Sequence, residues 1–141
     1  EMLRDDPERA GKVVEETVRM TTPTQGFWRF AKNDVEVAGT KIPAGTRMVV
    51  MFASANRDES IFPDGDNFDP DRDDLFSHLA FGKGAHYCLG ASLARLELRV
   101  ALEELVKRID TYELTAANNF DYLPSFMLRG LKSLEIEINP A

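Results

Sequence analysis

The only cysteine of the chain, Cys88, lies in a glycine-rich stretch, residues 81–90, directly before a segment with helical periodicity. A sulfur at the start of a helix lies near backbone N–H groups that have no intrahelical partner and near the positive end of the helix dipole, so negative charge on it is favoured. Glycines allow the backbone of the stretch to approach a flat group closely. Because a thiolate is a metal ligand, the pattern favours a ligating role for Cys88.

The neighbours of the cysteine could complete two different metal sites. His86 can hydrogen-bond an acid, and the N–H groups of Leu89 and Gly90 can donate to the sulfur, as the proximal side of an iron porphyrin requires. Alternatively, Cys88, His86 and His78 could supply three ligands to zinc and leave a fourth position open. A lone cysteine can also be a small buried apolar residue. The residues alone leave these alternatives open.

The stretch resembles the cysteine-ligand loop of the cytochrome P-450 superfamily, the haem-thiolate monooxygenases. The pattern of that loop is Phe-x-x-Gly-x-His-x-Cys-x-Gly, and the chain matches it at Phe81, Gly84, His86, Cys88 and Gly90. The resemblance implies haem b as cofactor and Cys88 as the axial ligand of its iron. The residues that it implies for haem binding are Cys88, His86, Arg29, Phe81, Gly82, Leu89 and Gly90.

A second feature is the pair Glu16 and Arg19, whose spacing places both side chains on one face of a helix. The Glu-x-x-Arg pattern is weak by itself, since Glu1 and Arg4 repeat it and most such pairs are exposed ion pairs of little energetic value. Arg72, in Phe-Asp-Pro-Asp-Arg, resembles the meander arginine of the superfamily. The resemblance implies a buried Glu16–Arg19–Arg72 cluster that supports the haem pocket and takes no part in catalysis.

The resemblance also extends to the residues around the cofactor. Arg29 resembles a strand arginine that contacts one haem propionate, and His86 would contact the other; a guanidinium suits a carboxylate because it offers paired donors in one plane. Two apolar segments resemble those that line the substrate pocket, which implies a hydrophobic substrate, although such side chains could equally form a core. The pocket residues expected are Phe27, Trp28, Phe126 and Met127.

The elements that would position these residues are of mixed type, and the expected fold class is α+β. Asp6 is the expected N-cap of a helix that starts at Pro7 and ends near Met20. A second helix, residues 91–108, has apolar residues along one face and is expected to pack as a core helix. Small hairpin sheets and an irregular meander, residues 56–74, complete the fold. The expected strands are residues 27–31, 35–38, 48–53, 111–115, 126–128 and 134–138.

Composition excludes several classes of function. The net charge of −7 argues against nucleic acid as a partner, because binding a phosphate backbone favours a basic face. A single cysteine excludes an internal disulfide and fits a reducing compartment. The sequence contains neither a secretory segment nor an apolar run long enough to span a bilayer, so no membrane association and a cytoplasmic location are expected.

The chain starts at Glu1, without an initiator methionine, and its 141 residues suffice for one domain. The resemblance covers the C-terminal portion of a soluble bacterial-type member, so residues 1–141 are expected to be a haem-ligating segment without the N-terminal part and the central oxygen-activating helix. The whole protein would insert one atom of O2 into an apolar substrate, with electrons from a ferredoxin-type donor and its NAD(P)H-dependent reductase. Lys83 could face that donor.

The segment by itself is expected to lack activity, to bind haem weakly if at all, and to self-associate through apolar surface that other parts of the fold would cover. Two alternatives of other classes stay open at this point. One is a haem-binding or interaction module without catalytic activity, and the other is the zinc-site enzyme.

Overall fold

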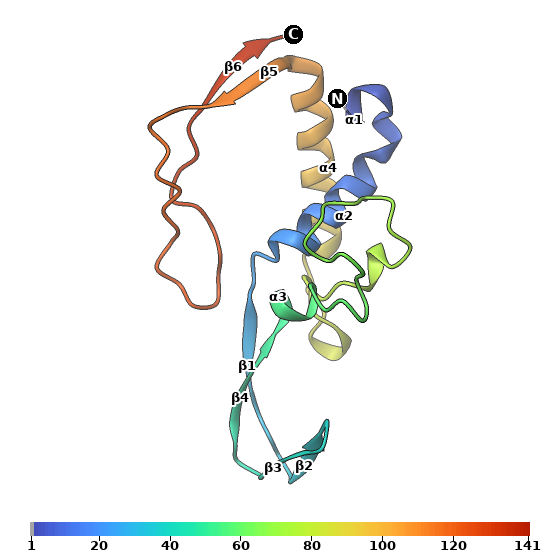
Figure 1. The fold of residues 1–141 in the computed structure, drawn as a ribbon, viewed down its shortest axis with the longest axis vertical. Helices are drawn as coiled ribbons and strands as arrows, with labels where there is room; N and C mark the ends of the chain where they lie inside the picture. The colour runs from blue at the N-terminus through green and yellow to red at the C-terminus, as the bar shows by residue number, and fades with distance from the viewer. Residues whose placement is uncertain (1) are drawn as a thin grey trace.

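The computed structural model describes residues 2–141. Glu1, and with it the second Glu-x-x-Arg pair formed by Glu1 and Arg4, lies outside the described residues. It combines helices with three separate two-stranded antiparallel sheets, which confirms the predicted α+β class (Figure 1). The helices are α1 (Met2–Asp5), α2 (Ala10–Thr21), α3 (Phe52–Ala55) and α4 (Ala91–Arg108), with short 3-10 turns η1 (Pro7–Arg9), η2 (Leu75–Ser77) and η3 (Gly84–His86). The strands are β1 (Gly26–Phe30), β2 (Val35–Val37), β3 (Thr40–Ile42), β4 (Arg47–Met51), β5 (Ile109–Leu114) and β6 (Ile136–Pro140).

The first long helix begins as predicted, with one difference in its first turn. The Asp6 side chain accepts a hydrogen bond from the Glu8 N–H at 3.2 Å, and Pro7 occupies the position where a missing N–H costs nothing. This first turn is a 3-10 helix, and α2 proper begins at Ala10. The helix ends at Thr21, because Thr22 takes a left-handed conformation, φ 36°, ahead of Pro23.

The sheets confirm the predicted hairpins, with corrections at their ends. Strand β1 pairs with β4, and in Figure 1 this ribbon extends away from the helices with the β2–β3 hairpin at its tip. The prediction of a strand as far as Ala53 is wrong, because the chain turns into α3 at Phe52. The predicted strand at residues 126–128 is also wrong, since only Leu128 forms an isolated bridge, to Thr24. The three-residue strand β3 was not predicted.

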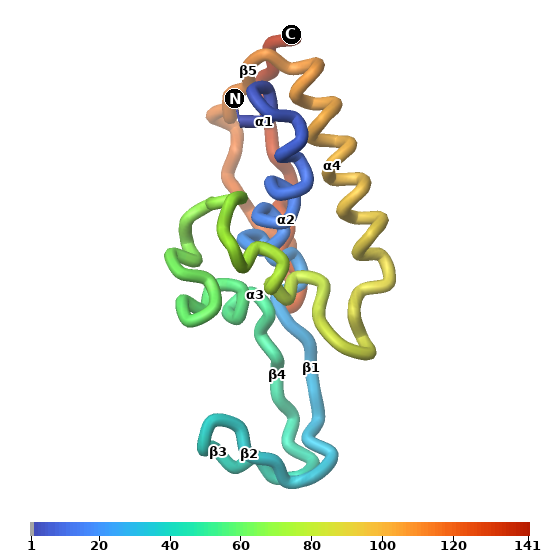
Figure 2. Tube along the Cα trace, turned by 90° about the vertical axis from the view of Figure 1, so that its right-hand side faces the viewer, coloured from blue at the N-terminus to red at the C-terminus, as the bar shows by residue number. Residues whose placement is uncertain are grey.

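Helix α4 lies alongside α2, as Figure 2 shows, but it is not a core helix. Only Ala91 is buried, while Leu98 and Leu105 are 39% and 50% exposed. The prediction was wrong because α4 finds a neighbour on one side only within residues 2–141. The accessible surface of 10215 Å² exceeds the roughly 7,300 Å² that a compact monomer of this mass exposes.

The small core gathers around α2 and the irregular segment 56–74. Phe62 anchors that segment at 2% exposure, whereas Phe68 in the same segment is 47% exposed. The apolar residues that are buried are Ala10, Val14, Val18, Ala31, Phe52, Phe62, Leu75 and Ala91. Within residues 2–141, no helix has the length and apolar character needed to cross a membrane.

Candidate functional site

The loop around Cys88 is closed by its own backbone. The Cys88 N–H donates to the Phe81 carbonyl at 2.9 Å, and the Tyr87 N–H donates to the Gly84 carbonyl at 3.0 Å. Gly82 and Gly84 have φ values of 72° and 74°, which residues with a Cβ rarely adopt. The glycines therefore let the loop turn tightly. Cys88, an exposed free thiol, lies at the end of this loop, three residues before the first residue of α4.

A groove of about 810 Å³ brings Cys88 together with several of the predicted haem-binding residues. It collects side chains from α2, the start of β1, the end of β4, α3, the cysteine loop and α4. Most of its lining is apolar, and its polar side chains are few, which is typical of a site for a small organic group. The lining residues are Val18, Pro23, Thr24, Phe27, Arg29, Val50, Phe52, Leu79, Ala80, Phe81, Gly82, Lys83, His86, Cys88, Ala94 and Leu98.

The surroundings of the sulfur fit a metal-bound thiolate. A Cβ added to Gly90 would lie 3.9 Å from the Cys88 Sγ, at ordinary van der Waals distance, so Gly90 lies directly beside the sulfur. The hydrogen bonds found within residues 2–141 leave the N–H groups of Leu89 and Gly90 without an acceptor. Donors of this kind can moderate the charge of a ligating sulfur. Leu89 is fully exposed and is not among the residues that line the groove.

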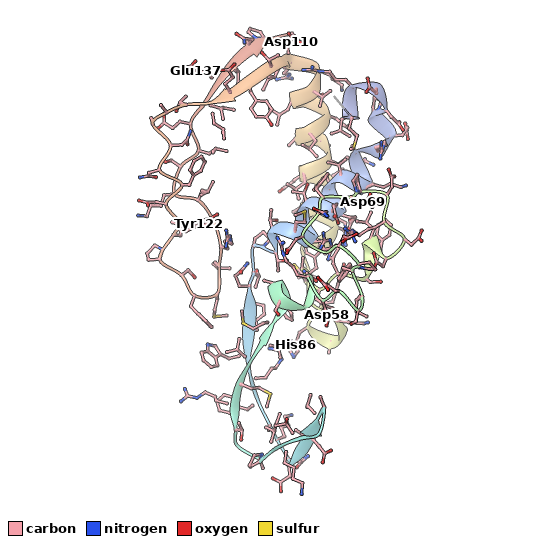
Figure 3. All side chains as sticks on the ribbon, in the orientation of Figure 1. Asp58, Asp69, His86, Asp110, Tyr122 and Glu137 are labelled. Carbon is pink, nitrogen blue, oxygen red and sulfur yellow. The ribbon has the colours of Figure 1, made fainter. Side chains whose placement is uncertain are left out.

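Arg29 and His86 both line the groove, although they come from β1 and from η3. The only hydrogen bond of the Arg29 side chain within residues 2–141 joins its Nη1 to the Trp28 carbonyl, at 2.9 Å, so most of its donors remain available. Figure 3 shows His86 beside the β1–β4 ribbon, which agrees with the shared groove. Two separate donors are what a group with two carboxylates would require.

The four predicted substrate-pocket residues do not lie together. Phe27 lines the groove and packs edge-on against Phe52, with ring centroids 6.0 Å apart. Trp28 is its neighbour in β1 and points to the other face, as alternation along a strand requires, and its ring lies 6.1 Å from that of Phe126. Trp28, Phe126 and Met127 are not among the residues that line the groove. The Met127 backbone carbonyl accepts from the Gln25 N–H at 2.7 Å.

Glu16, Arg19 and Arg72 meet in a buried ion cluster, termed here the Glu16 cluster. Glu16 and Arg19 are fully buried, and the Arg19 Nε and Nη2 donate to the two carboxylate oxygens of Glu16 at 2.7 and 2.8 Å. The Arg72 Nε donates to Glu16 Oε1 at 3.1 Å. Figure 3 places Asp69 beside α2, and its N–H donates to the same oxygen at 2.9 Å. The acid therefore has a full set of partners.

The same cluster ties α2 to the irregular segment. The Arg19 Nη1 donates to the carbonyls of Asn56, at 2.6 Å, and Gly65, at 2.8 Å. Burial by itself would raise the pKa of Glu16, but the hydrogen bonds from Arg19, the Asp69 N–H and Arg72 outweigh it, and the pKa is lowered. A segment without helix or strand thus gains fixed contacts through charged side chains.

Glu15 forms a second buried cluster, which sequence analysis missed. Its carboxylate accepts from the His78 Nε2 at 2.9 Å and from the Arg95 Nε and Nη2 at 2.5 and 2.9 Å. Burial raises the pKa of Glu15, but the hydrogen bonds from His78 and Arg95 outweigh this effect and lower the pKa to about 2. The sequence did contain one sign of this cluster. Glu15 stands between Val14 and Glu16, on the side of the helix expected to be buried, and a buried charge needs partners.

The zinc alternative has no geometric support. His78 is buried, its Nε2 donates to Glu15, and its Nδ1 accepts from the Ala80 N–H at 3.2 Å, so both ring nitrogens are engaged. Within residues 2–141, no three His, Cys, Asp or Glu side chains are placed to hold a metal ion together. Haem fits better, because it needs a single protein ligand beside a broad apolar surface.

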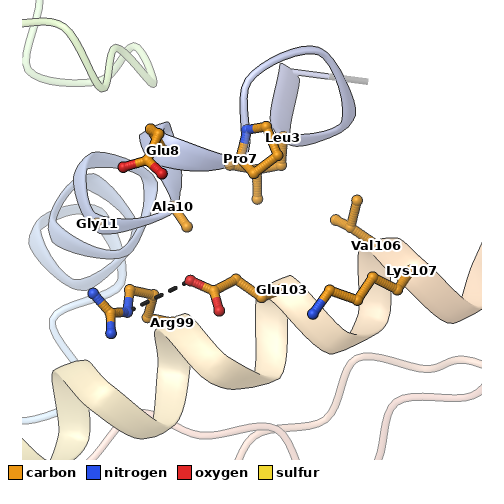
Figure 4. Close-up of a pocket in the computed structure, with 9 residues that line it drawn as sticks. All are labelled: Leu3, Pro7, Glu8, Ala10, Gly11, Arg99, Glu103, Val106 and Lys107. Atoms are coloured by element: carbon orange, nitrogen blue, oxygen red, sulfur yellow. Dashed lines mark ion pairs between the residues drawn. The ribbon is translucent and has the colours of Figure 1, made fainter.

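A second hollow, of about 440 Å³, lies between the N-terminal turns of the chain and the C-terminal half of α4 (Figure 4). It contains an exposed ion pair between Arg99 Nε and Glu103 Oε1 at 3.5 Å. It shares no lining residue with the groove at Cys88 and so is a separate feature. Its lining residues are Leu3, Pro7, Glu8, Ala10, Gly11, Arg99, Glu103, Val106 and Lys107.

Comparison with known proteins gives a consistent result. Residues 10–133 match the sequence model of the cytochrome P-450 family. Cytochrome P-450 144 of Mycobacterium tuberculosis is 38% identical over 138 residues, which cover 98% of this chain and 31% of that protein. The steroid C26-monooxygenase of the same organism is 37% identical over 142 residues, covering 100% of this chain and 38% of that protein.

A solved structure agrees with the sequence matches. The crystal structure of CYP109E1 from Bacillus megaterium in complex with testosterone superposes with a TM-score of 0.92 at 37% identity, over 98% of this chain and 38% of that one. The chain thus spans about a third of the length of the relatives that it matches. The cysteine loop, the Glu16 cluster and these matches lead to one conclusion: the chain belongs to the cytochrome P-450 family.

Proposed function

We propose that the chain is the C-terminal, haem-binding segment of a cytochrome P-450 monooxygenase, a protein that inserts one atom of O2 into an apolar organic substrate. One observation carries this proposal most strongly. The free thiol of Cys88 stands at the start of α4 in a largely apolar groove of about 810 Å³ that also contains Arg29 and His86. That combination suits an iron porphyrin with one thiolate ligand and two carboxylates.

In this proposal the seven expected haem-binding residues have defined tasks. Cys88 is the iron ligand, and the free N–H groups of Leu89 and Gly90 moderate the charge on its sulfur. Arg29 and His86 bind the two propionates, while Phe81 and Gly82 contact the porphyrin face. Haem supplies the oxygen activation and electron transfer when it is bound, and the chain supplies orientation and charge.

The Glu16 cluster has a supporting task. It fixes α2 and the irregular segment relative to each other through ion pairs and through carbonyl contacts of Arg19. None of its three side chains lines the groove. We therefore assign it to the scaffold of the site, and not to the reaction.

The substrate proposed is a hydrophobic small molecule, because Phe27, Phe52 and Leu98 contribute apolar lining to the groove. A steroid is one substrate class worth testing, since one relative is a steroid C26-monooxygenase and a matching structure holds testosterone. Of the four pocket residues expected from sequence, Phe27 has the strongest support. Trp28, Phe126 and Met127 would need a substrate that reaches beyond the groove.

The proposed electron source is a ferredoxin-type protein with its NAD(P)H-dependent reductase. Lys83 lies in the cysteine loop and also lines the groove, so it offers a positive charge near Cys88 to an acidic donor. For these 141 residues alone, we propose no monooxygenase activity and self-association through apolar side chains such as Leu98 and Leu105, which are exposed here.

The proposal is tested by following the origin of the inserted oxygen. The full-length protein, supplied with a ferredoxin, a reductase and testosterone, should give a hydroxylated product that carries one labelled atom when the dioxygen is labelled. Cys88→Ala should give none, while Lys32→Ala, on the turn between β1 and β2, should behave as the wild type. Full turnover by Cys88→Ala would overturn the proposal.

A further inference from the structure

The two adjacent acids of α2 serve different parts of the fold. Successive residues of a helix point about 100° apart, so Glu15 and Glu16 face different neighbours. Glu16 contacts the irregular segment through Asp69 and Arg72, whereas Glu15 contacts the region of the cysteine loop through His78 and Arg95. We call Glu15, His78, Tyr87 and Arg95 the Glu15 cluster. Helix α2 thus holds two separate segments with two neighbouring carboxylates.

The Glu15 cluster holds the cysteine loop at both of its ends. His78 lies ten residues before Cys88, and Arg95 lies seven residues after it, in the second turn of α4. Both side chains bond to one carboxylate that is buried to 4% exposure. The Ala80 N–H bonds to the His78 Nδ1, which leaves the Nε2 proton to point at Glu15. The two ends of the loop are therefore fixed to the same point on α2.

Arg95 also reaches the residues that contact the cysteine directly. Its Nη1 donates to the Tyr87 hydroxyl at 2.8 Å, and its guanidinium lies over the Phe81 ring at 4.5 Å from the centroid. Tyr87 directly precedes Cys88, and the Phe81 carbonyl accepts the Cys88 N–H. Bidentate bonding to Glu15 prevents the guanidinium from turning, so these two contacts have a fixed origin.

We propose that the Glu15 cluster positions Cys88: Glu15 and Arg95 hold Tyr87 and Phe81, and these hold the loop that presents the sulfur. This inference rests on the proposed function, because positioning matters for a sulfur that binds iron. It assigns positioning roles to Glu15, His78, Tyr87 and Arg95, none of which is an expected contact of the haem. Loosening the cluster should free the loop and let the iron lose its sulfur ligand more readily.

Three variants test the proposal in the haem-loaded full-length protein. Glu15→Gln keeps the shape and removes the charge, and Arg95→Lys keeps the charge and removes the paired donors. Tyr87→Phe removes one hydroxyl from a half-exposed ring, so its fold is not at risk. Glu103→Gln is the matched control, because the ion pair of Glu103 with Arg99 is exposed and lies outside the Glu15 cluster.

Two measurements distinguish positioning from general stability. Backbone hydrogen exchange in residues 79–90 should become roughly tenfold faster in Glu15→Gln and Arg95→Lys, and about threefold faster in Tyr87→Phe, while exchange in β1 and β4 stays unchanged. The reduced carbon monoxide complex should lose its thiolate-type Soret band faster in the same order. Glu103→Gln should match the wild type in both measurements.

The outcomes separate this inference from the proposed function. Loop exchange within twofold of the wild type in both Arg95→Lys and Tyr87→Phe would overturn the positioning role, even if Cys88→Ala still abolishes the thiolate band. Faster exchange throughout the protein in all three variants would also overturn it, because that result means a structural role only. A wild type without a thiolate band would refute the proposed function, and the exchange data would still decide whether the cluster orders the loop.

Discussion

Replacing Arg19 by methionine tests the Glu16 cluster most severely. Methionine fills a similar volume but donates no hydrogen bond, so Glu16 would lose its two strongest bonds, at 2.7 and 2.8 Å. The carbonyls of Asn56 and Gly65 would lose their donor as well. Because both Arg19 and Glu16 are fully buried, water cannot replace these bonds without opening the structure.

The expected loss is about 3–5 kcal/mol of the free energy of unfolding, since one partner of a buried ion pair is left without the other. That loss raises the unfolded fraction by on the order of a hundredfold or more. Two contacts of Glu16 survive, to Arg72 and to the Asp69 N–H, and they keep the loss from being larger. Urea unfolding of the full-length protein measures the difference through its midpoint and slope.

The control is Lys12→Met in the same helix. Lys12 pairs with Asp71 at 3.0 Å, but both side chains are about half exposed, so this change should cost less than about 1 kcal/mol. In Glu16→Leu with Arg19→Met, the combined loss should be smaller than the sum of the two single losses, because no carboxylate is stranded. An Arg19→Met loss as small as that of Lys12→Met would refute the buried-cluster reasoning.

Three further predictions concern other parts of the chain. Gly26→Ala should lower the urea midpoint of unfolding, because its Cβ would lie 2.5 Å from the Val50 carbonyl oxygen. Gly11→Ala has open space around its Cβ and should stabilise α2 by about 0.5–1 kcal/mol. The pKa of Glu15 is lowered from 4.5 to about 2, so the contribution of its ionised form to stability is complete above about pH 4.5 and falls as the pH drops toward 2. In urea unfolding measured at several pH values, Glu15→Gln should lose this part of the acid dependence. A Glu15→Gln pH profile identical to that of the wild type would contradict this prediction. Arg29→Leu should speed haem transfer to apomyoglobin roughly tenfold if Arg29 binds a propionate, while the same rate as in Arg47→Leu, at the far end of β4, would contradict that role.

Features encoded by local sequence were predicted well. The glycines and Cys88 lie within ten residues, and Asp6 with Pro7 marks the start of a helix without help from distant contacts. The Glu16 cluster was reached only through family resemblance, because Arg72 is 56 positions from Glu16. No local pattern could have joined them.

Features that depend on distant partners were missed. Glu15 is 63 positions from His78 and 80 from Arg95, so its cluster is visible only after folding. Residues 52–53 continue an apolar run that suggests a strand, yet tertiary contacts turn them into α3. The apolar face of α4 indicated burial, but periodicity does not say whether a covering partner is present within the same 141 residues.

The central claim is that the Cys88 sulfur binds the haem iron, and the carbon monoxide difference spectrum of the reduced full-length protein tests it most directly. The wild type should show the Soret band of thiolate-ligated haem, and Cys88→Ala should lose that band while His86→Ala retains it. A wild-type band that persists in Cys88→Ala would contradict the claim.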